Sequence, residues 1–248
     1  VIRVVPTEAA TDQAVRDQAP HARWFMDYRN ADGSLSEMCG NGTRVFAAFL
    51  RREGLESADE FAIATRAGVK HVRVDGDGFA VGLGPWRLGD PATAQRDGFD
   101  ALVHLDDLEP FSALTVDVGN PHTVVALPEA VDLDAVDLTT APAVRPEPVH
   151  GTNVEIVRPL GPGHVAMRVF ERGVGETRSC GTGACAAAIA TSFWAGSLDT
   201  GSTWVVDVPG GRLTVRLLPD QGVELAGPAA LVADGVIDLA QLSRRAQP

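Results

Sequence analysis

Residues 39–44 read CGNGTR and residues 180–185 read CGTGAC, and each stretch is followed by a run of apolar residues. The pattern Cys-Gly-x-Gly at the start of an apolar run therefore occurs twice in the chain. Glycine is typical of positions where the backbone comes close to a ligand or to another segment. A repeat of this kind predicts two related halves, each built around one helix.

The apolar runs after the two motifs predict helices of different character. The first helix is expected over residues 42–53, with Gly54 as its C-terminal stop. Its apolar stripe consists of Val45, Phe46, Phe49 and Leu50. The second helix is expected over residues 183–195 and stops at Gly196. Because it is apolar on every side, it is expected to be surrounded by protein.

Short segments with β-branched residues or alternating polarity predict strands around these helices. They are residues 60–65, 71–74, 114–118, 123–127, 153–157, 164–170, 204–208 and 213–217. Many strands and two buried helices indicate an α+β chain. We expect an N-terminal half over residues 1–113, to which residues 227–248 could return, and a C-terminal half over residues 114–226.

Composition excludes several classes of protein. The chain has 248 residues, 45% of them hydrophobic, which is enough for one large domain or two small ones. A net charge of −12 without any Lys/Arg-rich run argues against nucleic acid or a membrane surface as partner. No run reaches the roughly 20 apolar residues of a spanning helix, and the first residues do not resemble a signal peptide. The sequence thus predicts a soluble, cytoplasmic protein.

The only lysine, Lys70, restricts the chemistry further. Any mechanism that needs a Schiff-base lysine would have to use this position. Lys70 lies in the alternating run of residues 68–74, for which a solvated face is the expected environment.

The two motif cysteines, Cys39 and Cys180, stand immediately before the predicted helices. The positive end of a helix favours the charged form of such a thiol, and its free N–H groups can bind a carboxylate. Two such sites that face each other would supply two thiols on opposite sides of one carbon atom. This arrangement suits the removal and replacement of a proton next to a carboxylate, which inverts the stereocentre.

The third cysteine, Cys185, lies inside the Ala-rich second helix. A cysteine in such a position is expected to be a small buried hydrophobic residue. A metal site is not expected either, because Cys180 and Cys185 have neither a second paired cluster nor a nearby histidine. The sequence therefore assigns chemistry to Cys39 and Cys180 alone.

Five segments of the chain, in order, resemble motifs of the diaminopimelate epimerase family. Residues 38–44 (MCGNGTR) and 171–185 (ERGVGETRSCGTGAC) are similar to its two active-site motifs. Residues 28–34 (YRNADGS), 119–122 (GNPH) and 151–155 (GTNVE) are similar to its intervening motifs. The resemblance implies two pseudo-symmetric domains, each a mostly antiparallel sheet rolled around a central helix.

The resemblance also implies an activity. It is the cofactor-independent interconversion of LL- and meso-diaminopimelate, in lysine and peptidoglycan precursor biosynthesis, by an enzyme that is usually a homodimer. Cys39 and Cys180 would be the acid/base pair. The reacting carboxylate would be held by Gly40, Asn41, Gly181 and Thr182. The remote end of the substrate would be bound by Asn30, Asn120, Asn153 and Arg172, with Glu171 meeting an ammonium group. His122 could orient or polarise a thiol.

The chain departs from the family pattern at its start. Family members normally begin with a strand and a turn that carries a further substrate asparagine. This chain starts beyond them, so the first domain is expected to lack its N-terminal strands. The stretch before Cys39 is accordingly shorter than the stretch between residue 114 and Cys180.

Three alternative functions are compatible with the sequence. Proline racemases and hydroxyproline epimerases share the two-thiol plan, but a histidine usually follows their first Cys-Gly, where this chain has Asn41. Their small cyclic substrates would also need no remote Arg172. A binding module could keep the fold without chemistry, although the two thiols argue against it. A pyridoxal-dependent racemase would require Lys70 as its Schiff base.

Overall fold

The computed structural model describes residues 1–30, 33–35, 38–105 and 108–236. Residues 237–248, part of the segment expected to return to the first half, lie outside the described residues. The helices are α1 (Gln13–Arg16), α2 (Gly40–Arg52), α3 (Pro91–Asp97) and α4 (Gly181–Trp194), with short 3-10 helices at Thr7–Ala9 and Pro219–Gln221.

The strands of the described residues all join one continuous sheet. They are β1 (Ile2–Pro6), β2 (Trp24–Tyr28), β3 (Glu60–Thr65), β4 (Gly68–Asp75), β5 (Gly78–Pro85), β6 (Arg87–Leu88), β7 (Ala101–His104), β8 (Phe111–Asp117), β9 (Pro121–Ala126), β10 (Ala143–Arg145), β11 (Asn153–Gly161), β12 (His164–Glu171), β13 (Gly175–Thr177), β14 (Thr203–Val208), β15 (Gly211–Leu217) and β16 (Gly222–Pro228).

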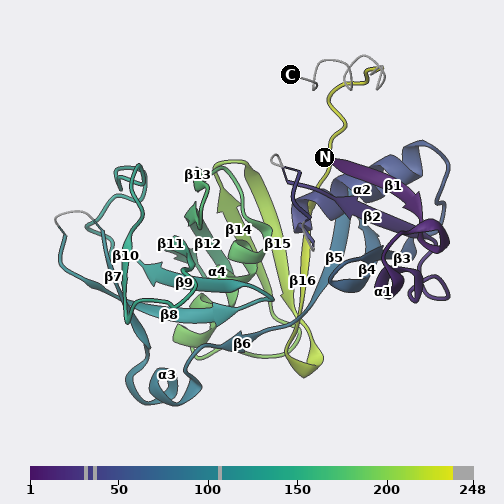
Figure 1. Ribbon diagram of the computed structural model, residues 1–248. Helices are drawn as coiled ribbons and strands as arrows, with labels where there is room; N and C mark the ends of the chain where they lie inside the picture. The colour runs from purple at the N-terminus through teal and green to yellow at the C-terminus, as the bar shows by residue number, and fades with distance from the viewer. Residues whose placement is uncertain (31–32, 36–37, 106–107, 237–248) are drawn as a thin grey trace.

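The order of the strands defines two lobes. It runs β1-β2-β3-β4-β5-β16-β15-β14-β12-β11-β9-β8-β7-β10, with β13 on β12 and β6 on β8. Here β1–β5 with α2 are called the first lobe, and β6–β15 with α4 the second lobe (Figure 1). Most neighbours are antiparallel, and the described parallel pairs are β2/β3, β9/β11 and β12/β14. The predicted fold class, α+β with mostly antiparallel sheets around central helices, is confirmed.

Strand β16 connects the two lobes, because it pairs with β5 on one side and β15 on the other. Its Glu224 accepts hydrogen bonds from Arg73 on β4 (3.0 Å) and Arg216 on β15 (2.5 Å). Strands β6 and β7 precede residue 114 in the sequence but pair with β8. The exact division into residues 1–113 and 114–226 stays a prediction.

Helix α2 packs on the sheet of the first lobe through Thr43, Phe46, Ala47 and Leu50. The predicted stripe is wrong at Val45, which is 40% exposed. Residues 43, 46, 47 and 50 follow the helical spacing of one face, and Val45 falls beside that face. Gly54 has the left-handed backbone (φ +68°) that ends the helix as predicted.

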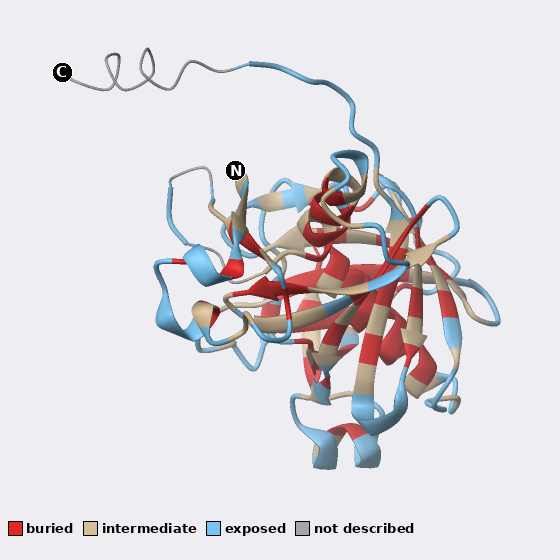
Figure 2. Cartoon of the chain, turned by 90° about the vertical axis from the view of Figure 1, so that its right-hand side faces the viewer, coloured by how far each residue is buried: buried red, intermediate tan, exposed pale blue. Residues whose placement is uncertain are grey.

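Helix α4 is enclosed by the second lobe, as the sequence predicts. Its residues from Ala184 to Ser192 are all buried. Figure 2 shows the buried segments gathered inside the sheets, with the exposed segments in the outer loops. Within the described part of the chain, no helix combines the length and apolarity required to cross a lipid bilayer.

Candidate active site

The two motif cysteines occupy equivalent positions at the start of the central helices. Cys39 is the N-cap of α2, and its Sγ accepts a hydrogen bond from the amide of Gly42 (3.5 Å). Cys180 is the N-cap of α4, and its Sγ accepts one from the amide of Gly183 (3.4 Å). Each cysteine uses an N–H group that has no acceptor within its own helix. Both helices begin two residues earlier than predicted, directly after the cysteine.

The starts of α2 and α4 touch each other across the boundary between the lobes. A Cβ atom added at Gly181 would lie 3.7 Å from the Cα of Gly40 and 2.8 Å from Cδ2 of the buried Leu225. Asn41 joins the two motifs directly, because its Nδ2 donates to the carbonyl oxygen of Ser179 (3.2 Å). The motif glycines therefore let two helix N-termini approach more closely than side chains would permit.

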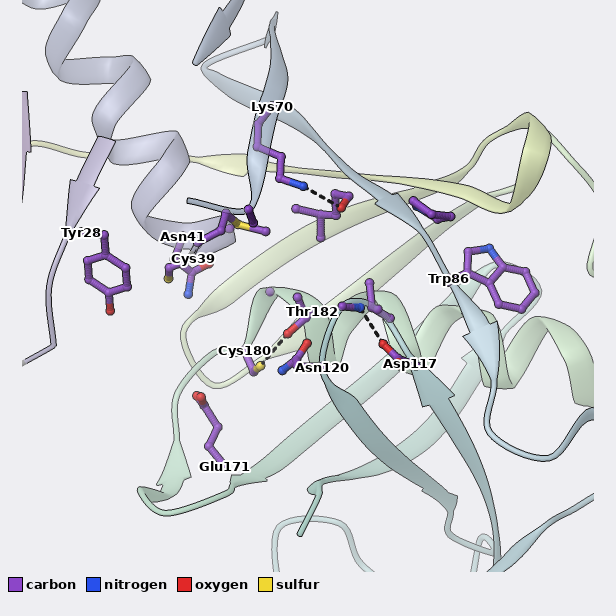
Figure 3. A pocket seen from close by; sticks show the side chains of 18 of the residues that line it. Tyr28, Cys39, Asn41, Lys70, Trp86, Asp117, Asn120, Glu171, Cys180 and Thr182 are labelled. Carbon is purple, nitrogen blue, oxygen red and sulfur yellow. Dashed lines mark hydrogen bonds between the residues drawn. The ribbon is translucent and has the colours of Figure 1, made fainter. Parts of the chain in front are cut away.

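A cavity of about 940 Å³ opens between the lobes, and both cysteines lie in its wall (Figure 3). Its lining contains most of the residues that the sequence singled out. They are Asn30, Cys39, Gly40, Asn41, Asn120, Glu171, Cys180, Gly181 and Thr182. Segments far apart in the sequence thus meet at one site, with a helix N-terminus from each lobe.

Three predicted site residues lie outside the lining of this cavity. Asn153 is buried, donates to the carbonyl oxygen of Pro121 (3.1 Å) and accepts from the backbone N–H of Arg172 (2.9 Å). Arg172 is exposed, and its guanidinium bonds to the carbonyl oxygen of His150. His122 is buried behind Asn120. The substrate contacts expected for Asn153 and Arg172 stay predictions.

Electrostatics keep Cys180 in its neutral form. Burial and the negative charges of Glu155 and Glu171 raise the pKa of Cys180 to about 12, although hydrogen bonds from Thr182 and Gly183 act in the opposite direction. The helix N-terminus therefore favours the thiolate, as the sequence predicts, but desolvation and two carboxylates outweigh it. The raised pKa therefore favours the thiol form of Cys180.

The surroundings of Cys39 carry the opposite charge. Arg44 is 5% exposed and donates to Oδ1 of Asn41 (2.8 Å) and to the carbonyl oxygen of Gly40 (3.3 Å). Burial lowers the pKa of Arg44, and the charge of Cys39 acts to raise it. One thiol thus lies near a buried guanidinium, whereas the other lies near carboxylates.

The prediction for Lys70 is wrong. Lys70 is half-buried, lines the cavity and donates from Nζ to the carbonyl oxygen of Leu83 (3.2 Å), and burial lowers its pKa. An alternating strand pattern distinguishes the two faces of a strand, but it does not tell which face meets another lobe.

Several residues of the cavity wall were not predicted at all. Tyr28 lines the cavity, and burial, followed by the charges of Cys39 and Glu171, raises its pKa. Trp86 and Asp117 lie at the other end of the cavity. For Tyr28 a signal existed, since it begins the quoted segment 28–34. Trp86 and Asp117 carry no local pattern, because only the packing of the lobes brings them to the site.

Comparison with known proteins gives consistent results. The family model described as diaminopimelate epimerase matches residues 8–88 and 114–232. The chain is 46% identical to the diaminopimelate epimerase of Streptomyces coelicolor over 243 residues, which cover 94% of this chain and 80% of the relative. It is 44% identical to that of Thermobifida fusca over 249 residues, covering 98% and 84%.

Two solved structures share the fold at low sequence identity. A probable proline racemase from Agrobacterium radiobacter has a TM-score of 0.65 at 15% identity, covering 96% of this chain and 76% of that one. A hydroxyproline epimerase from Agrobacterium vitis has a TM-score of 0.62 at 15% identity, covering 92% and 71%. At this identity the likeness concerns the fold alone.

Proposed function

The chain belongs to the diaminopimelate epimerase family, and on this premise we propose that it interconverts LL- and meso-diaminopimelate by proton transfer between two thiols. The observation that supports the chemistry best is that two N-cap cysteines, one from each lobe, line one cavity. The reaction would supply meso-diaminopimelate for lysine and peptidoglycan synthesis. A cytoplasmic homodimer that needs no cofactor is part of the same proposal.

The proposed proton transfer uses the two cysteines in opposite protonation states. With Cys180 in the thiol form, Cys39 is the base: its thiolate takes the α-proton, and the C–H bond breaks. Cys180 gives its proton to the opposite face of the same carbon, and a new C–H bond forms there. Each turnover therefore exchanges the protonation states of the two cysteines, and the reverse reaction starts from the exchanged state.

The two helix N-termini would hold the reacting carboxylate. The amides of Gly42 and Gly183 are used by the thiols. The first two amides of each helix, at residues 40, 41, 181 and 182, have no acceptor within the helix. Aimed at one carboxylate, they would stabilise the negative charge that develops when the α-proton leaves.

The remote amino-acid end of the substrate would lie toward Asn30, Asn120 and Glu171, which also line the cavity. Glu171 would meet the ammonium group, and the two amides would bind the carboxylate. Arg172 would join them by exchanging its present bond to His150 for a bidentate pair with that carboxylate. Asn153 would support it through the backbone of Arg172.

Hydrogen exchange in D2O tests this function. We expect LL-diaminopimelate to convert to meso-diaminopimelate with deuterium entering at the inverted α-carbon, as followed by NMR and chiral chromatography. L-proline is expected to remain unlabelled. A protein that binds diaminopimelate without deuterium incorporation would be a binding module. A protein that labels proline instead would be a proline racemase, and either result would overturn the proposal.

Redox sensitivity is a further expected property. Because the two sulfur atoms must flank a single carbon, they are expected to lie close enough to oxidise to each other. Activity should disappear in a mild oxidant and return with a thiol reductant. Mass spectrometry should then locate the disulfide between Cys39 and Cys180, with Cys185 still free. Activity that does not respond to redox conditions would contradict a facing pair of thiols.

A further inference from the structure

A buried carboxylate in the second lobe has no part in the mechanism above. Glu155 on β11 and His122 on β9 both have fully buried side chains, and Glu155 Oε1 lies 2.7 Å from His122 Nδ1. The parallel pairing of β9 and β11 places Asn153 beside His122. Since alternate residues of a strand share a face, Glu155 points to the same side as Asn153 and His122.

This pair of side chains extends to the cavity. His122 Nε2 lies 3.0 Å from Oδ1 of Asn120, and Asn120 lines the cavity beside Cys180 and Thr182 (Figure 3). With the imidazole held on both sides, Glu155 cannot change its position without disturbing His122 and Asn120. The carboxylate is therefore fixed relative to the site.

Glu155 also contacts the first turn of α4. A Cβ atom added at Gly183 would lie 2.6 Å from Glu155 Oε1 and 3.3 Å from the Sγ of Cys180. The carboxylate and the thiol thus approach the same glycine. The second oxygen, Oε2, is buried and has no hydrogen-bond partner among the described residues.

The contact of Glu155 with Gly183 brings a negative charge close to the thiol of Cys180. The groups that act on its thiol are Glu155 on β11, Glu171 on β12, the hydroxyl of Thr182 and the amide of Gly183. The other titratable groups packed nearby are Cys185 on α4 and His122 on β9, which contacts Glu155. A buried carboxylate oxygen without a partner repels a second negative charge strongly, because little solvent screens it. Of the two carboxylates, Glu155 is the larger cause of the raised pKa of Cys180. Near Cys39 the corresponding buried charged residue is Arg44.

We propose that Glu155 is a positioning residue that holds the proton on Cys180, acting across Gly183 while His122 holds it in place. This makes the second-lobe thiol the acid of the resting protein. The inference rests on the proposed function only for its catalytic meaning, since the protonation of Cys180 can be measured without any substrate.

Alkylation of Cys180 as a function of pH tests the proposal. The measurement uses the full chain with Cys39→Ala, iodoacetamide as the probe and peptide mass spectrometry to separate Cys180 from the buried Cys185. We expect Cys180 to react appreciably only at the alkaline end of the range. In Glu155→Gln, the alkylation rate of Cys180 should begin to increase at a pH at least one unit lower. At a given pH below that increase, alkylation should therefore be about tenfold faster than in the parent.

Two further variants complete the experiment. Glu176→Gln removes a carboxylate of β13 that pairs with Arg168 and is not among the groups that act on Cys180, so its alkylation profile should coincide with that of the parent. Glu155→Asp keeps the charge but withdraws it from Gly183, and it should shift the profile in the same direction by a smaller amount. Glu155→Asp also allows the proposal to be tested if Glu155→Gln does not fold. Profiles that do not move in the folded Glu155 variants would overturn the proposal.

Glu155→Gln in the enzyme that retains both Cys39 and Cys180 distinguishes a positioning role of Glu155 from a purely structural one. Glu155→Gln should move the alkaline limb of the kcat/KM profile to lower pH while KM at neutral pH changes little. A fall in kcat that is equal at every pH would mean a structural role only, and would overturn the inference. If the alkylation profile shifts but diaminopimelate is not turned over by the unmodified protein, the proposed function fails and the inference about Cys180 stands.

Discussion

Turnover of LL-diaminopimelate is expected to fall by roughly 10²- to 10⁴-fold in Cys39→Ala and equally in Cys180→Ala, the range that one positioned acid or base contributes. In the proposed mechanism each thiol acts on one face of the α-carbon, and no other described side chain of the cavity occupies an equivalent N-cap. Loss of either thiol is therefore expected to reduce inversion to this extent. The measurement is the rate of meso-diaminopimelate formation by chiral chromatography, in both directions of the reaction.

Cys185→Ala is the matched control for this prediction. Cys185 lies in α4 close to Cys180, but it is fully buried among alanines and does not line the cavity. Burial raises the pKa of the Cys185 thiol, so it stays in the neutral form at neutral pH. We expect its replacement to leave turnover within about twofold, since removing an SH group there changes packing only. Near-normal turnover in either motif variant would refute the two-thiol mechanism.

The second large effect is expected for Asn41→Asp, which should lower kcat/KM by roughly 10²-fold, mainly through a higher KM. The amide of Asn41 donates to Ser179 and accepts from Arg44. Aspartate keeps the contact with Arg44 but loses the donor, which leaves the carbonyl of Ser179 unpaired at about 1–3 kcal/mol. Aspartate also places a negative charge where the two helix N-termini would bind the substrate carboxylate. Since each loss of about 1.4 kcal/mol lowers kcat/KM tenfold, the two effects together account for the expected change.

Gln18→Glu provides the control for Asn41→Asp. The amide of Gln18 also donates to a backbone carbonyl, that of Thr65 (3.0 Å), but Gln18 does not line the cavity. The substitution thus removes the same kind of donor and adds the same charge at a remote position. Steady-state kinetics should show an unchanged KM for Gln18→Glu. An Asn41→Asp variant with the KM of the parent would exclude Asn41 from the carboxylate site.

The sequence predicted those features of the fold that depend on local chemistry. Both central helices lie where the Cys-Gly-x-Gly motifs and the terminal glycines place them, and all eight predicted strand segments lie within or overlap strands. The strands that were not predicted are β1, β2, β5, β6, β7, β10, β13 and β16. In β5 three glycines break the pattern, and in β16 glycines stand near both ends. These two strands form the boundary between the lobes, where a weak local pattern coincides with close packing of backbone.

The candidate site could be predicted only in part, for a similar reason. An N-cap is set by the residues next to it, so the positions of Cys39 and Cys180 follow from the sequence. The position of Lys70 depends on how two lobes meet. Glu155 lies in a strand that is buried on both faces: Val154 and Ile156 belong to one hydrophobic cluster, and Val157 belongs to the cluster around α4. Alternation along such a strand gives no sign that its charged residue is buried.

The strand that the lobes share, β16, constrains how the gap between the thiols can vary. Domains joined by a flexible linker can change their separation at little energetic cost. Here the two lobes share one hydrogen-bonded sheet, and Glu224 on β16 accepts hydrogen bonds from Arg73 of the first lobe and Arg216 of the second. Increasing the distance between the two cysteines therefore requires the sheet to twist. The distance between Cys39 and Cys180 therefore depends on how far this sheet can twist.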